Sequence, residues 1–212
     1  MQALALFDLD NTLVQRDLAF GAWAAEFAAE HGVDAGWLVA ADARHEGPRG
    51  GFFDLVRDRF GLDASGEELW RQYRRRMPEL VRCRGEDLAA LAGLRAAGWR
   101  VGIVTNGTTG NQLGKIRNTG LDRHVDAWCI SEDVDLRKPD PRIFRLAAAR
   151  CGLSADGGGW MVGDSLAHDI AGGAAAGLRT AWITQPGATP DPRPDVTAGS
   201  VAEAVVALLA TA

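Results

Sequence analysis

The side chains that could carry chemistry lie at or after the ends of short apolar runs of the sequence. They are Asp8 and Asp10 after the first run, Thr105 and Asn106 after the second, Lys138 after the third, and Asp164 and Asp169 after the fourth. Clustered carboxylates repel each other by roughly 4 kcal/mol per close pair at an effective dielectric constant of 20. If these groups meet, a hard divalent cation with oxygen ligands, most simply Mg²⁺, would offset the repulsion. The lysine and the hydroxyl group would then suit a phosphate, which also bridges to Mg²⁺.

The apolar runs are typical of strands buried on both faces, and they alternate with helical patterns along most of the chain. Strands are expected at Ala3–Phe7, Trp99–Thr105, Val125–Ser131, Trp160–Gly163 and Thr180–Thr184. Helices are expected at Glu86–Ala97, Ile143–Cys151, Leu166–Ala176 and Val201–Leu209. This alternation predicts an α/β fold with a Rossmann-like parallel sheet wrapped by helices. Ligands gather beyond the carboxyl ends of such strands, so the seven polar side chains are expected at one edge.

Residues 16–85 break the alternation, because no convincing strand pattern occurs there. Four helical stretches are expected instead, at Leu18–Glu30, Ala35–Arg44, Phe52–Arg59 and Glu67–Val81, with Gly47–Gly51 as a loop. Most of the aromatic side chains in this segment are expected to form a small core of their own. We therefore predict a core domain of residues 1–15 and 86–212 with an inserted all-helical cap domain of residues 16–85. The proline-rich segment Gln185–Ser200 is expected to be a surface connection.

At the polar residues the sequence resembles the haloacid dehalogenase (HAD) superfamily of phosphotransferases. The segments FDLDNTL, VTNG, RKPD and GDSLAHD are similar to the four motifs of that family and occur in its order. The resemblance covers essentially the whole chain, including a helical cap between the first and second motifs. It implies a Mg²⁺-dependent phosphatase that hydrolyses small phosphorylated metabolites through an aspartyl-phosphate intermediate.

The same resemblance implies a role for each polar side chain. Asp8 would be the nucleophile, Asp10 the general acid/base, and Lys138 a third catalytic residue. The implied phosphate-binding residues are Thr105, Asn106 and Lys138. The implied metal-binding residues are Asp8, Asp10 through its backbone carbonyl, Asp164 and Asp169. These roles agree with in-line attack on phosphorus, which needs a nucleophile, a cation and donors for the phosphoryl oxygens.

Four other functions compete with a phosphatase. A haloacid dehalogenase is disfavoured because dehalogenases of this family lack the second aspartate of the first motif, whereas Asp10 is present. A phosphonate hydrolase is disfavoured because its chemistry uses a lysine of the cap, and residues 16–85 contain none. A sugar-phosphate mutase would fit the same core. A non-catalytic metabolite-binding protein on this fold is not favoured, because no motif residue is missing.

Composition excludes several other classes of protein. With 28 acidic and 23 basic residues in 212, the formal charge of −5 argues against a nucleic-acid partner. The three cysteines lack a C-x-x-C pattern, which argues against a disulfide framework or a structural zinc site. No apolar stretch reaches the roughly 18 residues of a membrane span. We expect a cytoplasmic monomer or homodimer without a membrane partner, whose partner is a small phosphorylated metabolite.

Two basic segments lie outside the four motifs. Thr109–Ile116 nearly matches a phosphate-binding loop but lacks its first glycine and its final Ser or Thr, so we interpret it as a helix. The chain has only two lysines, and Lys115 in this segment is predicted to contribute little to activity, in contrast to Lys138. The arginine-rich run Arg71–Arg84 is either a solvated helix face or a source of arginines that select a second anionic group.

Overall fold

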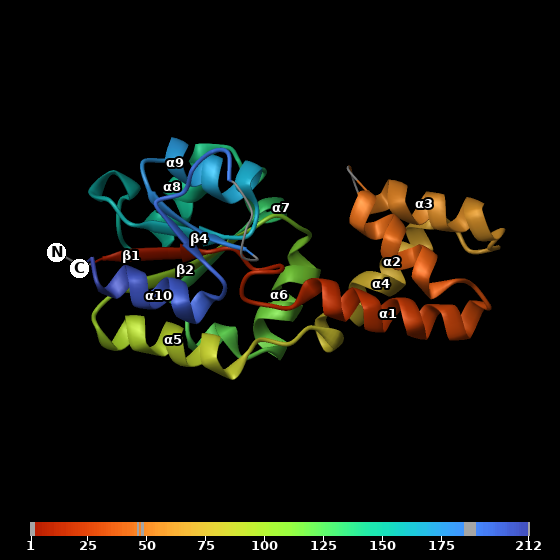
Figure 1. Ribbon diagram of the computed structural model, residues 1–212. Coiled ribbons are helices and arrows are strands. Elements are labelled where there is room, and N and C mark those ends of the chain that lie inside the picture. Colours follow the sequence, from red (N-terminus) through yellow and green to blue (C-terminus); the bar gives the residue numbers. More distant parts are fainter. Residues whose placement is uncertain (1–2, 46, 48, 185–189, 212) are drawn as a thin grey trace. The chain divides into compact units, whose positions relative to one another are not determined.

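The computed structural model describes residues 3–45, 47, 49–184 and 190–211 (Figure 1). The chain divides into two compact units, of which one combines Met1–Gln15 with Cys83–Ala212 and the other is Arg16–Arg82. Among the described residues, all six strands of the sheet belong to the first unit, and the second unit is helical. The helical unit ends at Arg82, whereas the sequence placed the end of the cap at residue 85.

A six-stranded parallel sheet forms the centre of the first unit, with the strand order β3-β2-β1-β4-β5-β6. The strands are β1 (Leu4–Phe7), β2 (Arg100–Thr105), β3 (Ala127–Ile130), β4 (Trp160–Gly163), β5 (Arg179–Ile183) and β6 (Val196–Ala198). Strand β1 pairs with β2 on one side and with β4 on the other, and all four of its residues are buried. The predicted parallel α/β fold is therefore confirmed.

Helices cover both faces of this sheet, with α8 and α9 on one face and α5 and α10 on the other (Figure 1). The helices are α5 (Gly85–Ala96), α6 (Thr109–Asn118), α7 (Ser131–Val134), α8 (Pro141–Arg150), α9 (Ala171–Ala175) and α10 (Val201–Leu209). Short 3₁₀ turns lie at Leu121–Arg123 and Ala155–Gly157, and a π-helical turn at Leu166–Ile170. Helix α8 begins where Asp140 accepts a hydrogen bond from the Arg142 amide and Pro141 takes the first position.

The apolar core under α8 explains why this helix lies close to the sheet. Its buried residues include Ile143 and Phe144 of α8 together with Leu4 and Leu6 of β1. A Cβ atom at Gly102 of β2 would come within 2.7 Å of the Cys151 sulfur at the end of α8 and 2.9 Å of Leu6. Glycine at this position therefore allows the helix to approach the strand.

Strand β6 was missed by the sequence analysis, which assigned its residues to a surface connection. It pairs in parallel with β5 at the edge of the sheet, and Asp195 just before it accepts a hydrogen bond of 2.8 Å from the Thr180 amide. Three residues directly after a proline-rich stretch give too short a pattern to recognise as a strand. Residues 185–189 of the same segment lie outside the described residues.

Over its described residues, the helical unit contains four helices and an aromatic core. The helices are α1 (Arg16–His31), α2 (Ala35–Arg44), α3 (Arg49–Phe60) and α4 (Gly66–Leu80). The buried rings of Phe20, Trp23, Phe52, Phe53 and Tyr73 contact one another, which confirms the predicted internal core. Helix α3 begins at Arg49, inside the expected loop Gly47–Gly51. Because Phe52 and Phe53 are buried, their packing stabilises a helix that includes the two glycines before them.

Polar contacts within the helical unit bear on the arginine-rich run. Arg74, with a side chain that is 27% exposed, pairs with Glu67 at 3.0 Å, and Arg76, which is 40% exposed, pairs with Glu26 at 2.7 Å. Arg76 therefore fits the solvated helix face. Among the described residues, no helix combines the length and apolar composition that a bilayer span requires.

Candidate active site

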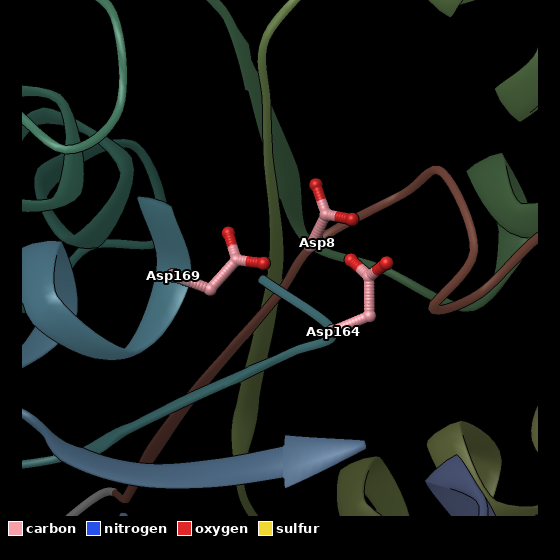
Figure 2. A group of neighbouring side chains, drawn as sticks. All are labelled: Asp8, Asp164 and Asp169. Atoms are coloured by element: carbon pink, nitrogen blue, oxygen red, sulfur yellow. The ribbon is translucent and has the colours of Figure 1, made fainter. Parts of the chain in front are cut away.

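Three carboxylates converge beyond the carboxyl ends of β1 and β4 (Figure 2). Asp8 follows β1, Asp164 follows β4, and Asp169 lies in the π-helical turn Leu166–Ile170. One oxygen of each carboxylate lies within 4.8 Å of the other two. Because β1 and β4 are neighbours in the sheet, residues far apart in sequence meet here, as the sheet-edge rule predicts.

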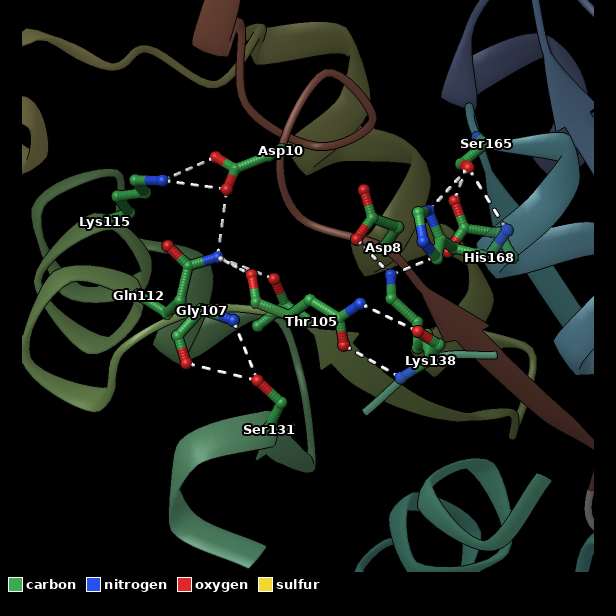
Figure 3. A network of polar contacts seen from close by, with 12 residues as sticks. Asp8, Asp10, Thr105, Gly107, Gln112, Lys115, Ser131, Lys138, Ser165 and His168 are labelled. Atoms are coloured by element: carbon green, nitrogen blue, oxygen red, sulfur yellow. Dashed lines mark hydrogen bonds and ion pairs between the residues drawn. The ribbon is translucent and has the colours of Figure 1, made fainter. Parts of the chain in front are cut away.

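Lys138 lies beside this cluster in the loop between α7 and α8 (Figure 3). Its Nζ atom is 2.5 Å from Asp8 Oδ1 and 2.6 Å from Asp169 Oδ1, and the side chain is buried. Burial alone would lower the pKa of Lys138, but the two carboxylates outweigh that effect and raise it. Lys138 is therefore a fixed ammonium group in contact with Asp8.

One ammonium group does not balance three carboxylates. Burial raises the pKa of Asp8 despite the opposing effect of Lys138, and Asp169 and Asp164 raise it further. Burial, followed by the charge of Asp169, raises the pKa of Asp164 to about 7. The cluster therefore carries a shortage of positive charge and offers only hard oxygen ligands, a donor set that fits a divalent cation such as Mg²⁺.

The position of Asp169 depends on a close approach to the end of β4. A Cβ atom at Gly163 would come within 2.3 Å of Asp169 Oδ2, so only glycine leaves room for the carboxylate there. The same oxygen accepts a hydrogen bond of 3.0 Å from the Ser165 amide. The indole of Trp182 donates to the backbone carbonyl of Asp164 at 2.7 Å. This bond holds the start of the turn that leads from Asp164 to Asp169.

The Asn106 side chain contacts the backbone of Lys138 through both atoms of its amide. Its Oδ1 atom accepts a hydrogen bond of 2.9 Å from the Lys138 amide, and its Nδ2 atom donates to the Lys138 carbonyl at 3.1 Å. This pair of bonds ties the Lys138 peptide to the end of β2. The contacts therefore give the Asn106 side chain a positioning role, and the sequence could not reveal which loop it would meet.

Lys115, which is expected from the sequence to contribute little to activity, also lies beside a site residue. It is buried in α6, and its Nζ atom lies 2.7 and 2.8 Å from the two carboxylate oxygens of Asp10 (Figure 3). Gln112, one helical turn earlier and also buried, contacts Asp10 and Thr105. Gln112 and Lys115 are three positions apart in a predicted helix, so the sequence indicates that their side chains share one face. The scarcity of lysine in this chain was a further signal.

The structure thus brings the seven expected residues into two connected groups. Asp8, Lys138, Asp164 and Asp169 form the charged cluster, and Asn106 supports Lys138. Asp10 and Thr105 are joined through Gln112. The sequence analysis missed the contributions of Gln112 and Lys115 to this arrangement.

Sequence comparison agrees with these motifs. The family model described as haloacid dehalogenase-like hydrolase matches residues 3–177. The chain therefore belongs to the family of haloacid dehalogenase-like hydrolases, and the resemblance noted in its sequence is confirmed.

Individual relatives include both phosphatases and dehalogenases. Phosphoserine phosphatase of Thermus thermophilus is 35% identical over 124 residues, which span 58% of this chain and about half, 49%, of that protein. Ribulose-1,5-bisphosphate 5-phosphatase of Halopiger xanaduensis is 33% identical over an alignment that covers 85% of this chain and 84% of that protein. The crystal structure of 2-haloacid dehalogenase from Pseudomonas syringae pv. Tomato DC3000 is 26% identical, with a TM-score of 0.67 and complete coverage of both chains. Family membership alone therefore does not select the reaction.

Proposed function

We propose that this hydrolase is a Mg²⁺-dependent phosphatase that acts on small phosphorylated metabolites through an aspartyl-phosphate intermediate. The observation that carries the proposal is the second aspartate, Asp10, which is held beside Thr105 through Gln112. An alkoxide leaving group needs a proton, whereas a departing halide does not. A carboxylate held at this place therefore favours phosphate ester hydrolysis over dehalogenation.

The contacts of the site support the following reaction. Asp8 attacks phosphorus, and the ammonium group of Lys138 reduces the repulsion between this carboxylate and the phosphoryl oxygens. The Thr105 hydroxyl donates a hydrogen bond to one of those oxygens. Asp10 protonates the leaving alkoxide and then takes a proton from the water that hydrolyses the aspartyl phosphate.

The metal would be held by the carboxylates of Asp8 and Asp164 and the backbone carbonyl of Asp10. Asp169 would support this set, since its own oxygens accept from Lys138 and Ser165. When bound, Mg²⁺ supplies positive charge against the phosphoryl oxygens. This assignment is supported by the oxygen-only donor set and by the raised pKa values of Asp8 and Asp164.

The function is tested by assaying p-nitrophenyl phosphate and a 2-haloacid with Mg²⁺ and with EDTA. We expect phosphate release with Mg²⁺, loss of it in EDTA, recovery on adding Mg²⁺ back, and no halide release. Halide release without phosphate release would instead indicate a dehalogenase, and full turnover in EDTA would exclude the metal. Transfer of phosphate between two positions of a sugar, detected by ³¹P NMR, would identify a mutase. Binding without turnover of any substrate would indicate a binding protein.

Mg²⁺ should stabilise the protein more at about pH 8 than at about pH 5. In the metal-free protein the pKa of Asp164 is about 7, above the value of roughly 4 for an unfolded aspartate. Its contribution to stability is therefore present below about pH 4 and is lost as the pH rises through 7. Ionised carboxylates also bind the metal more tightly than protonated ones. Melting curves with and without Mg²⁺ at both pH values check this, and an equal shift at both would contradict it.

We further infer that the helical unit Arg16–Arg82 acts as a cap that selects the substrate and closes over the core during the reaction. The insertion between β1 and α5, after the proposed nucleophile, supports this role. Short segments at Gln15–Asp17 and Arg82–Gly85 would serve as the hinge. Crystal structures with and without orthovanadate, a phosphate analogue, should differ in the placement of this unit. Identical placement in both would remove the support for closure.

A further inference from the structure

One face of α6 presents two buried polar side chains to the proposed acid/base. Lys115 contacts both carboxylate oxygens of Asp10, and Gln112 Nε2 donates to Asp10 Oδ2 at 3.0 Å. Gln112 is 1% exposed and Lys115 is 3% exposed. The two oxygens thus receive three polar contacts from one rigid helix, which fixes the direction of the carboxylate more firmly than a solvated ion pair would.

Gln112 also determines what the Thr105 hydroxyl can do. Its Nε2 atom lies 2.6 Å from Thr105 Oγ1 and 3.0 Å from Asp10 Oδ2. Asp10 Oδ2 accepts this hydrogen bond, so the amide turns its NH₂ group toward Asp10. The same NH₂ group then donates to Thr105, whose hydroxyl accepts this bond and keeps its own proton for another acceptor. Thr105 is thereby set to donate to a phosphoryl oxygen.

The surroundings of α6 leave this amide little freedom. A Cβ atom at Gly107 would come within 2.7 Å of Gln112 Cγ, so the glutamine fills the space that a glycine leaves. The Gly107 amide donates to Ser131 Oγ at 2.9 Å, and the Thr109 amide donates to Glu132 at 2.7 Å. These bonds anchor the start of α6 to α7. The helix therefore holds Gln112 and Lys115 in place relative to β2.

We propose that Gln112 and Lys115 are positioning residues for catalysis. Lys115 holds the carboxylate of Asp10 in place for its exchange of protons with the leaving group and the attacking water, and Gln112 fixes the same carboxylate and directs the Thr105 proton toward the substrate. The inference rests on the proposed phosphatase function and deepens it. Neither residue touches the reacting atoms.

The test compares an alkyl phosphate, glycerol 2-phosphate, with p-nitrophenyl phosphate, whose leaving group needs no proton. Lys115→Met should lower kcat on glycerol 2-phosphate roughly 10- to 100-fold, as expected when a catalytic group is misplaced by about 1 Å. Release of nitrophenol in the first turnover should fall much less, and KM should change little. Lys115→Arg, which restores a cation, should recover part of the loss. Gln112→Leu should raise KM and lower kcat on both substrates, because Thr105 loses its fixed orientation.

A double-mutant cycle separates positioning from general stability. In the Asp10→Asn background, Lys115→Met should cause no further loss of kcat, because the group that it positions no longer acts. Arg100→Met is the matched control, since it removes a cation that pairs with Asp126 at the amino end of β2. It should leave both substrates unaffected. Melting curves for each variant show whether the fold is retained.

Two kinds of failure can be told apart. If the unmodified protein hydrolyses neither phosphate ester, the proposed function falls and this inference falls with it. If the unmodified protein is active and Asp10→Asn is impaired, but Lys115→Met behaves like the unmodified protein, only the positioning role is overturned. Equal losses on both substrates that persist in the Asp10→Asn background would also overturn it. Should Lys115→Met not fold, Lys115→Gln, which removes the charge but keeps a polar side chain of similar length, decides by the same substrate comparison.

Discussion

Replacing Asp8 by asparagine should abolish phosphate ester hydrolysis and leave the fold intact. An amide cannot attack phosphorus, so turnover should fall roughly 10⁴- to 10⁶-fold, the range for loss of a catalytic nucleophile. Stability should be unchanged or higher without metal, because burial and two neighbouring carboxylates disfavour the ionised form of Asp8, as its raised pKa shows. The asparagine oxygen can still accept the hydrogen bond from Lys138. Steady-state rates, phosphoenzyme trapping and melting curves measure these effects.

Asp140→Asn is a suitable control for this substitution. Asp140 caps α8 and pairs with Arg142 on the surface, so its loss changes a carboxylate outside the charged cluster. We expect that variant to keep its turnover. Continued phosphoenzyme formation by Asp8→Asn would show that another residue is the nucleophile.

Replacing Lys138 by methionine should have the second largest effect. It removes the ammonium group that contacts both Asp8 and Asp169, while keeping much of the side-chain volume. We expect kcat to fall about 10³-fold or more, which is typical when a charge that stabilises a transferring phosphoryl group is lost. The metal-free protein should also melt at a lower temperature, because buried carboxylates lose their partner.

Lys138→Arg distinguishes the position of the charge from its presence. A planar guanidinium does not replace a compact ammonium that reaches two carboxylates at once, so this variant should also turn over poorly. Rates that match the unmodified protein would show that any cation at this place suffices. Unaltered rates in Lys138→Met would remove Lys138 from the reaction.

Much of the core and its charged cluster could be predicted from sequence because the relevant rules are local. Strands buried on both faces leave short apolar runs, and parallel strands end at one edge. Asp8 after β1 and Asp164 after β4 could therefore be placed together without knowing any contact. Lys138 is assigned to the same site because it belongs to the RKPD motif. Its contacts with two carboxylates are consistent with the role assigned to it.

The remaining features depend on which side chain meets which loop. Asn106 directly follows β2 as predicted, but its amide holds the Lys138 peptide, a contact across 32 positions that no local pattern encodes. The segment around Lys115 resembles an incomplete phosphate-binding loop and so suggests no role for this lysine. Its partner Asp10 lies 105 positions away, and no local pattern links the two residues. The face of α6 that turns toward the site is set by packing of the whole unit rather than by the helix itself.

The central place of β1 in the sheet has a consequence for biosynthesis. Translation produces β1 first, but its neighbours β2 and β4 begin only at Arg100 and Trp160. The nascent chain therefore carries an apolar strand with two unpaired edges, a template for aggregation, until both neighbours have emerged from the ribosome. The aromatic ring contacts of the helical unit Arg16–Arg82 join residues that are all translated before β2, so these contacts can form before β1 is paired. Asp8 can meet Lys138 and Asp164 only after residue 164 has been translated, so ribosomal intermediates that stop before β4 carry the proposed nucleophile without its site.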